Sequence, residues 1–193
     1  MEAFSDGVIA ILITIMVLEL RLPDGPHFSD LTGNGFPSKF FSYVLSFVFL
    51  GIYWNNHHHM LRATQRINGM ILWANLHLLF WLSLFPFATA WMGENHFAQT
   101  PTILYGVLGL CAGVAYYLLQ SLIVSEQGPD SALAKALGRD LKGKASPVIY
   151  IAGVALGFAN RWLALASYII VAVMWFIPDR RLEPRPQTEK MGA

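Results

Sequence analysis

Long apolar segments recur along the whole chain, and the charged residues lie in the short stretches between them. Hydrophobic residues make up 55% of the 193 residues and charged residues only 13%, about half the charged fraction of soluble domains. A helix needs ~20 apolar residues to cross the ~30 Å core of a bilayer. The sequence therefore predicts an all-α, polytopic membrane protein that has no appended soluble domain.

The apolar segments predict six transmembrane helices per subunit. These cover approximately 3–21, 38–60, 68–91, 101–124, 146–160 and 162–178. We expect one transmembrane domain over 1–178 and a disordered cytoplasmic tail over 179–193. Asn160 and Arg161 separate the last two helices, and this region could also form one long helix with a short re-entrant piece.

The positions of the basic residues predict the orientation, because Lys and Arg are retained on the cytoplasmic side of the membrane. If the N-terminus is inside, six spans leave only Arg21, Lys39 and Arg161 of the thirteen basic residues on the outer side. We therefore expect both termini in the cytoplasm. The first apolar helix lacks a basic start and a small-residue cleavage site, so no cleavable signal peptide is expected. The net charge of +1 gives no indication of nucleic-acid binding.

The segment FSDG at 4–7 places polar groups at the start of the first apolar helix. Ser5 or Asp6 could simply cap this helix, since both side chains can accept hydrogen bonds from unpaired backbone N–H groups. A helical period places one stripe of residues along the helix. The stripe consists of Phe4, Gly7, Ile11, Thr14, Ile15 and Leu18. The Thr14 hydroxyl could serve a pore, or it could bond back to a carbonyl of its own helix.

Three segments together resemble a known family. They are FSDGVIAILITIMVLEL at 4–20, YWNNHH at 53–58 and NLHLLFWLSLFPF at 75–87. The chain resembles the prokaryotic members of the transmembrane protein 175 family of potassium channels. The resemblance implies a homotetramer in the bacterial inner membrane, in which the first helix of each subunit lines one central pore. It implies a leak-type channel for K⁺ ions, which needs no cofactor and catalyses no reaction.

The resemblance also implies roles for residues on the first helix. Ile11 would form the hydrophobic constriction, followed by apolar rings at Ile15 and Leu18, and Thr14 would contribute hydroxyls to selectivity. A narrow apolar neck can gate a pore by dewetting. The sequence contains neither a TVGYG carbonyl filter nor an arginine ladder for voltage sensing, which agrees with the family.

A structural network around FSDG is the last implication of the resemblance. It would hold the first helix in place through hydrogen bonds to the second and third helices. Its members would be Phe4, Ser5, Asp6, Gly7, Trp54, His57 or His58, and Asn75. The family usually carries an arginine four residues before the phenylalanine, whereas this sequence starts at Met1, three residues before it. Either the natural chain starts further upstream or the network is built without that cation.

Two other functions compete with a channel. The run 57–59 is HHH, but adjacent helical residues point ~100° apart and carboxylates are scarce nearby in the sequence, so we expect no metal site and no membrane-embedded metalloenzyme. A secondary transporter is the stronger alternative, although we see no internal repeat between the two halves of the chain. Gly106, Gly109 and Gly113 could break a helix, but their spacing favours close helix packing.

Overall fold

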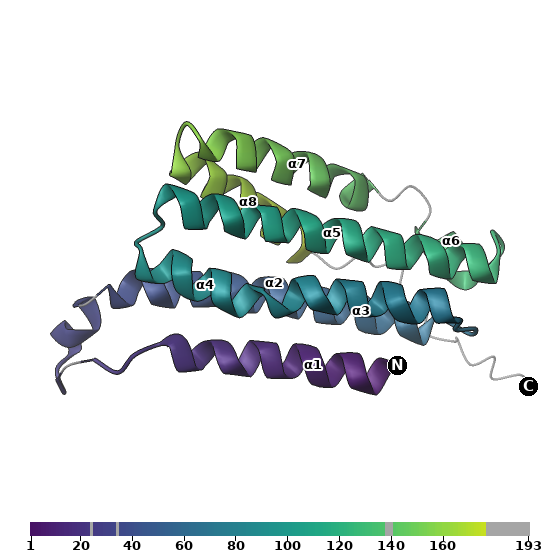
Figure 1. The fold of residues 1–193 in the computed structure, drawn as a ribbon, viewed down its shortest axis with the longest axis horizontal. Helices are drawn as coiled ribbons and strands as arrows, with labels where there is room; N and C mark the ends of the chain where they lie inside the picture. Colours follow the sequence, from purple (N-terminus) through teal and green to yellow (C-terminus); the bar gives the residue numbers. More distant parts are fainter. Residues whose placement is uncertain (24, 34, 138–140, 177–193) are drawn as a thin grey trace, which may run out of the picture.

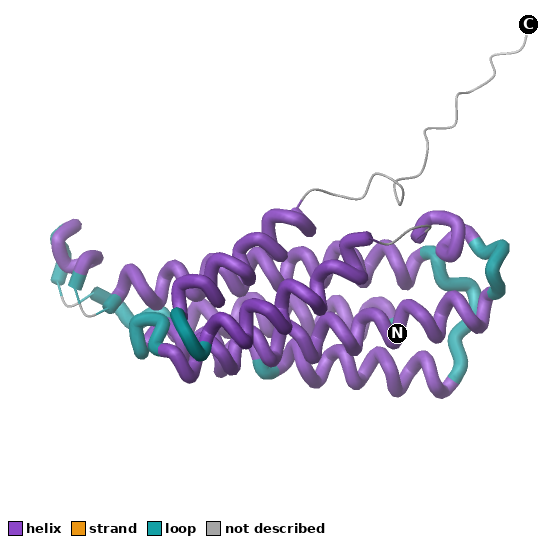
Figure 2. Tube along the Cα trace, turned by 90° about the horizontal axis from the view of Figure 1, so that it is seen from above, coloured by secondary structure: helices purple, strands orange, loops and turns teal. Residues whose placement is uncertain are grey.

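The computed structural model describes residues 1–23, 25–33, 35–137 and 141–176. Every regular element in this part of the chain is a helix, so the expected all-α fold is confirmed. The long helices run along the long axis of the molecule (Figures 1 and 2). The expected tail over 179–193 lies outside the described residues.

The first helix, α1, spans Glu2–Ile15 and continues as a 3₁₀ helix, η1, over Met16–Glu19. The sequence placed the start of this helix at approximately residue 3, and the structure places it at Glu2. Ser5 and Asp6 therefore lie inside the helix, and no side chain caps its start. The possibility that one of them caps the helix is therefore excluded, and the Ser5 hydroxyl instead donates to the Met1 carbonyl oxygen at 3.2 Å.

A loop with a short 3₁₀ helix, η2 (Phe28–Thr32), leads to α2, which spans Phe36–Arg62. Gly35 precedes α2 with φ +69°, in the left-handed region that glycine adopts without strain. The ring of His96 packs closely against Gly35, since a Cβ built there would lie 2.7 Å from its Cε1 atom. This contact joins the start of α2 to the turn after α4.

The third expected span, 68–91, is two helices, α3 (Gly69–Ser83) and α4 (Phe85–Glu94). They follow one another with a break at Leu84. Pro86 explains the break, because proline has no N–H to donate and its ring crowds the preceding turn. Asn68 caps α3 by accepting a hydrogen bond from the backbone N–H of Ile71 at 3.0 Å.

The second half of the chain contains α5 (Gln99–Gln127), α6 (Ala132–Leu137), α7 (Leu141–Gly157) and α8 (Arg161–Phe176). α7 and α8 are separate helices that pack against each other. Gly106 in the unbroken α5 faces the ring of Tyr168, and a Cβ at that position would collide with its hydroxyl group. This glycine allows close helix packing rather than breaking α5.

α1 lies at one edge of the bundle, where it packs against α2, α3 and α4 (Figure 1). α5 occupies a central position between α3 and α4 on one side and α7 and α8 on the other. Three helical stretches of the described residues are long and apolar enough to cross a membrane: Phe36–Arg62, Gly69–Glu94 and Gln99–Gln127. α8 is apolar but shorter.

Candidate functional site

The first helix has two chemically distinct faces. One face is buried and consists of Ser5, Ile9, Leu12 and Met16, at the spacing of a helical stripe. The opposite face is the stripe identified from the sequence, and all of its members are exposed in the single chain. Ile11 is 62% exposed and Leu18 is 76% exposed, although both are large apolar side chains. The bundle therefore holds α1 by one face, and among the described residues the other face is left without a packing partner.

A buried chain of hydrogen bonds fixes the first half of α1. The Asn75 amide on α3 donates to the Ser5 hydroxyl oxygen at 2.9 Å. Its carbonyl oxygen lies 2.7 Å from Nε2 of His57 on α2. All three side chains are buried, and without these bonds Nε2 of His57 and the Asn75 amide would each lack a partner, whereas Ser5 would keep its bond to the Met1 carbonyl. These bonds join α1, α2 and α3 at one point.

Other members of the expected network lie nearby with different contacts. The Asp6 carboxylate is 3.6 Å from Nδ1 of His58, and the Trp54 ring stacks on His58 with ring centroids 5.6 Å apart. Phe4 is 59% exposed, and Gly7 lies on the same exposed face. Neither contributes a side-chain hydrogen bond to this network. Within FSDG, Ser5 and Asp6 therefore contact the neighbouring helices, whereas Phe4 and Gly7 face outward.

The opposite end of α1 is held by contacts that the sequence analysis missed. The Thr89 hydroxyl on α4 lies 3.8 Å from the sulfur of Met16 and 2.6 Å from the Ser46 hydroxyl on α2. Ser46 also lies 3.0 Å from the Tyr105 hydroxyl on α5. A signal was available, because hydroxyl groups in the middle of apolar spans need partners and often mark helix contacts.

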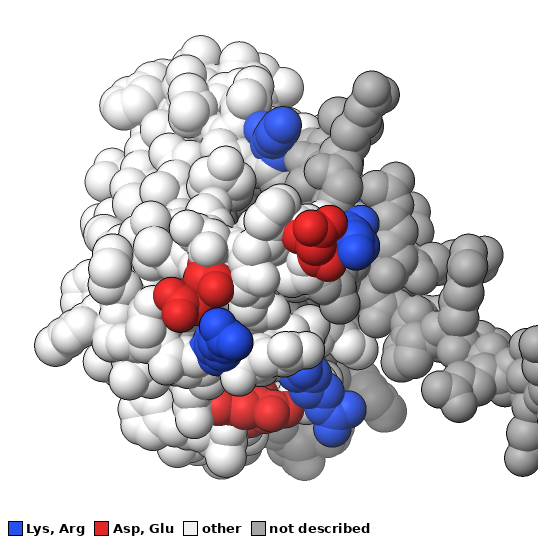
Figure 3. All heavy atoms as spheres, turned by 90° about the vertical axis from the view of Figure 1, so that its right-hand side faces the viewer, with Lys and Arg blue, Asp and Glu red and all other residues white. Residues whose placement is uncertain are grey.

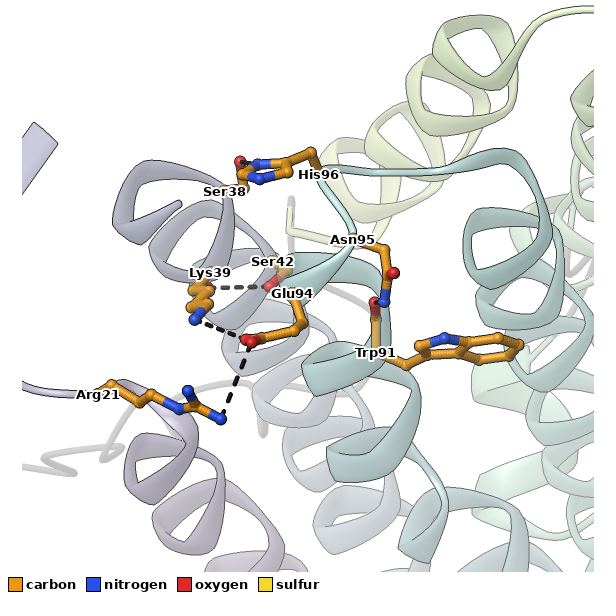
Figure 4. Close-up of polar contacts among 8 residues, drawn as sticks. All are labelled: Arg21, Ser38, Lys39, Ser42, Trp91, Glu94, Asn95 and His96. Atoms are coloured by element: carbon orange, nitrogen blue, oxygen red, sulfur yellow. Dashed lines mark hydrogen bonds and ion pairs between the residues drawn. The ribbon is translucent and has the colours of Figure 1, made fainter. Parts of the chain in front are cut away.

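An ion-pair cluster joins the end of α4 to α2 and to the residues after η1 (Figure 4). The Glu94 carboxylate at the end of α4 lies 2.6 Å from the Lys39 ammonium of α2 and 3.9 Å from the guanidinium of Arg21, which follows η1. The sequence had indicated only that Lys39 and Arg21 lie on the outer side of the membrane. Glu94 could have been recognised as their partner, because it is an acidic residue that follows directly after an apolar span.

Thr14 lies on the exposed face, and its hydroxyl donates within the helix to the carbonyl oxygens of Ala10 and Ile11, both at 3.0 Å. The back-bonding anticipated from the sequence is thus present. It uses the hydroxyl hydrogen and leaves lone pairs on the oxygen. This arrangement keeps an acceptor oxygen on the face of α1 that also carries Ile11, Ile15 and Leu18.

The exposed face of α1 is an apolar helix face on which Ile11, Ile15 and Leu18 surround the hydroxyl oxygen of Thr14. Of the three adjacent histidines, His57 points to Asn75 and His58 to the start of α1, which agrees with the argument that they cannot share one ion.

Comparison with known proteins identifies the family. A family model described as endosomal/lysosomal potassium channel TMEM175 matches residues 1–86. A protein from Chryseobacterium sp. (strain P1-3) named as a potassium channel is 46% identical over 183 residues, which cover 95% of this chain and 94% of that protein. A potassium channel of Streptomyces collinus is 27% identical, over 90% of this chain and 89% of its own length.

The fold also has a counterpart among solved structures. The crystal structure of a lysosomal potassium-selective channel TMEM175 homolog from Chamaesiphon minutus superposes with a TM-score of 0.74. The match covers 92% of this chain and 95% of that one at 24% identity, and it shows a shared fold. Taken with the 46% identity over nearly the full length of a named relative, these matches show that the chain belongs to the TMEM175 family of potassium channels.

Proposed function

We propose that this protein is a potassium-selective, leak-type channel in which four identical subunits surround one pore lined by α1. The observation that carries the proposal is the pair of faces on α1. One face is buried and makes polar contacts near both ends of the helix, at Ser5 and at Met16. The other face exposes Ile11 and Leu18 from a helix at the edge of the bundle. The names of the relatives support K⁺ as the permeant ion.

The proposed assembly is a homotetramer in which the four exposed faces of α1 meet. A helix that only faced lipid would not need an interhelical hydrogen-bond network at its start, since lipid places no demand on its rotation. The hydrogen bond that Asn75 donates to Ser5 and the burial of Met16 together set that rotation. The stripe from Phe4 to Leu18 would then point toward the common axis.

Permeation in this proposal is passive electrodiffusion. A ring of four Ile11 side chains forms the narrowest apolar neck, with Ile15 and Leu18 as further apolar rings, and the neck limits current because water leaves it readily. The Thr14 oxygens replace part of the hydration shell of the passing ion. K⁺ releases its shell more readily than Na⁺, so these oxygens favour K⁺.

The proposed membrane arrangement has six crossings per subunit and both termini on the cytoplasmic side of a bacterial inner membrane. Helix directions support it, because Arg62 at the end of α2 lies near the start of α1, whereas Arg21 and Lys39 cluster at the other end. The charge bias seen in the sequence is thus also a bias between the two ends of the bundle.

A liposome flux assay with purified protein tests the proposal. Vesicles loaded with K⁺ should lose it at a rate that rises linearly with the driving force and exceeds the rate for Na⁺ vesicles, and planar bilayers should show unitary current steps. Saturable flux without unitary steps would instead support a secondary transporter. The mass of the protein in lipid nanodiscs shows whether it is a tetramer. If the tetrameric protein produces no flux after reconstitution into vesicles, the channel proposal is overturned.

A further inference from the structure

We infer that Glu2, Asp6 and His58 form a binding site for one divalent transition-metal ion, with Zn²⁺ as the ion that suits it best. The cluster lies at the end of the bundle that carries the N-terminus, where acidic and basic side chains lie side by side (Figure 3). One ligand atom from each of the three residues lies within 4.8 Å of the other two. The site lies within one subunit and does not depend on the proposed channel.

The backbone brings these three residues together by simple helix geometry. Glu2 and Asp6 are four residues apart on α1, so their carboxylates project from the same face on consecutive turns. His58 comes from the last turns of α2, which packs against α1. Carboxylates are scarce near 57–59 in the sequence, which argued against a metal site, but the α1–α2 contact brings two of them to His58 from the start of α1.

The distances between the ligand atoms fit tetrahedral coordination of one ion. Nδ1 of His58 is 3.2 Å from a Glu2 oxygen and 3.6 Å from an Asp6 oxygen. Zinc bonds of ~2.0–2.2 Å place neighbouring tetrahedral ligand atoms ~3.3–3.6 Å apart. Two edges of the ligand triangle therefore already have about the required length, and the third closes with a rotamer shift of a Glu2 side chain that is 41% exposed.

The hydrogen-bonding state of the cluster points the same way. Nδ1 of His58 and Oδ1 of Asp6 are both shielded from solvent, and neither has a hydrogen-bond partner among the described residues. Nδ1 thus approaches two carboxylates without a well-directed hydrogen bond to either. A buried polar atom usually has a partner, and a shared cation would satisfy both of these.

The charges leave room for a cation. The two carboxylates carry two negative charges, and the nearest guanidinium, that of Arg62, lies 3.5 Å from Glu2 with a side chain that is 68% exposed. Arg62 compensates only one charge, and it can turn into solvent when an ion binds. An imidazole with two carboxylates is a borderline donor set that favours Zn²⁺ over Mg²⁺, which prefers oxygen ligands and retains its water.

The test is calorimetric titration of ZnCl₂ into full-length, tag-free protein in lipid nanodiscs. We expect about one Zn²⁺ per subunit, with affinity reduced at least about tenfold in Glu2→Gln and in His58→Gln. His59→Gln is the matched control, because it removes an adjacent imidazole outside the cluster, and its affinity should be unchanged. Arg62→Gln should bind Zn²⁺ more tightly, since it removes a competing cation.

Several results would overturn the site. These are no Zn²⁺ binding by the unmodified protein, equal losses in His59→Gln and His58→Gln, or Mg²⁺ competing with Zn²⁺ at equal concentration. Glu2→Gln keeps the test decisive if His58→Gln fails to fold, because Glu2 makes no hydrogen bond to the Ser5–Asn75–His57 chain. Loss of K⁺ flux with zinc binding intact would count against the channel and leave the site standing.

Discussion

Replacing Asn75 by leucine tests the anchoring of α1 most directly. The Asn75 side chain is 2% exposed and joins His57 on α2 to Ser5 on α1 through bonds of 2.7 and 2.9 Å. Leucine has a similar size and no polar atom. The substitution therefore removes both interhelical hydrogen bonds while it keeps the space filled, so that a loss of stability reflects the bonds rather than a cavity.

The expected loss of stability comes from the two hydrogen bonds and from the buried polar groups that lose their partners. Hydrogen bonds between membrane helices contribute on average ~0.6 kcal/mol, with a maximum of ~1.7 kcal/mol. Ser5 keeps its bond to the Met1 carbonyl, but Nε2 of the fully buried His57 is left without a partner, which costs ~1–3 kcal/mol. We expect Asn75→Leu to lower the free energy of unfolding by ~2–3 kcal/mol, with the larger share from His57.

The measurement is reversible unfolding of the subunit in bicelles by steric trapping. The matched control is Asn56→Leu on α2, because the Asn56 amide donates only within its own helix, to the Ile52 carbonyl at 2.8 Å. Its loss should stay within ~0.5 kcal/mol, as for most substitutions away from a network.

A double-mutant cycle between Ser5→Ala and Asn75→Leu decides the interpretation. A direct bond requires a coupling energy of ~0.6–1.7 kcal/mol between the two positions. If the two losses add within ~0.3 kcal/mol, the positions are independent and the anchoring of α1 by α3 is refuted.

Three further outcomes are expected. Ile11→Asn should raise the unitary conductance in planar bilayers by up to about tenfold, since a wettable neck that lowers the barrier by ~1.4 kcal/mol has this effect, and unchanged current would place the constriction elsewhere. Thr14→Ala should reduce the K⁺ over Na⁺ permeability ratio about two- to fivefold, corresponding to ~0.5–1 kcal/mol of discrimination, and an unaltered bi-ionic reversal potential would remove this hydroxyl from selectivity. Gly106→Ala should destabilise the subunit by ~1–3 kcal/mol because its methyl group collides with the Tyr168 hydroxyl, and thermal unfolding equal to that of the unmodified protein would contradict this packing.

The helices themselves were accessible from the sequence, because apolar length is a local property of the chain. The break at Leu84 was not predicted, although Pro86 was visible, since a proline can kink a membrane helix without ending it. The capping role considered for Ser5 or Asp6 is also not realised, because both residues lie inside a helix that begins at Glu2. Glu2 is helical despite lying before FSDG, and capping preferences locate a helix start only within a few residues.

The contacts between helices were only partly accessible. Periodicity places Ile11 and Thr14 on one stripe, and the structure leaves that stripe exposed, but periodicity alone does not say whether lipid or another subunit covers it. The approach of Glu2 to His58 depends on how far α1 slides along α2, which no local pattern encodes. The same holds for Glu94, whose two cationic partners come from distant parts of the chain.

The hydrogen bond between Ser5 and Asn75 also has a consequence for synthesis. The two residues are 70 positions apart, and ribosomes add ~5–20 residues per second, so α1 waits roughly 4–14 s for its partner to be made. During that time Ser5 has only the Met1 carbonyl as a partner. Nascent α1 would then be a substrate for the insertion machinery or a membrane chaperone until α3 enters the bilayer, and its rotation would be set only at that moment.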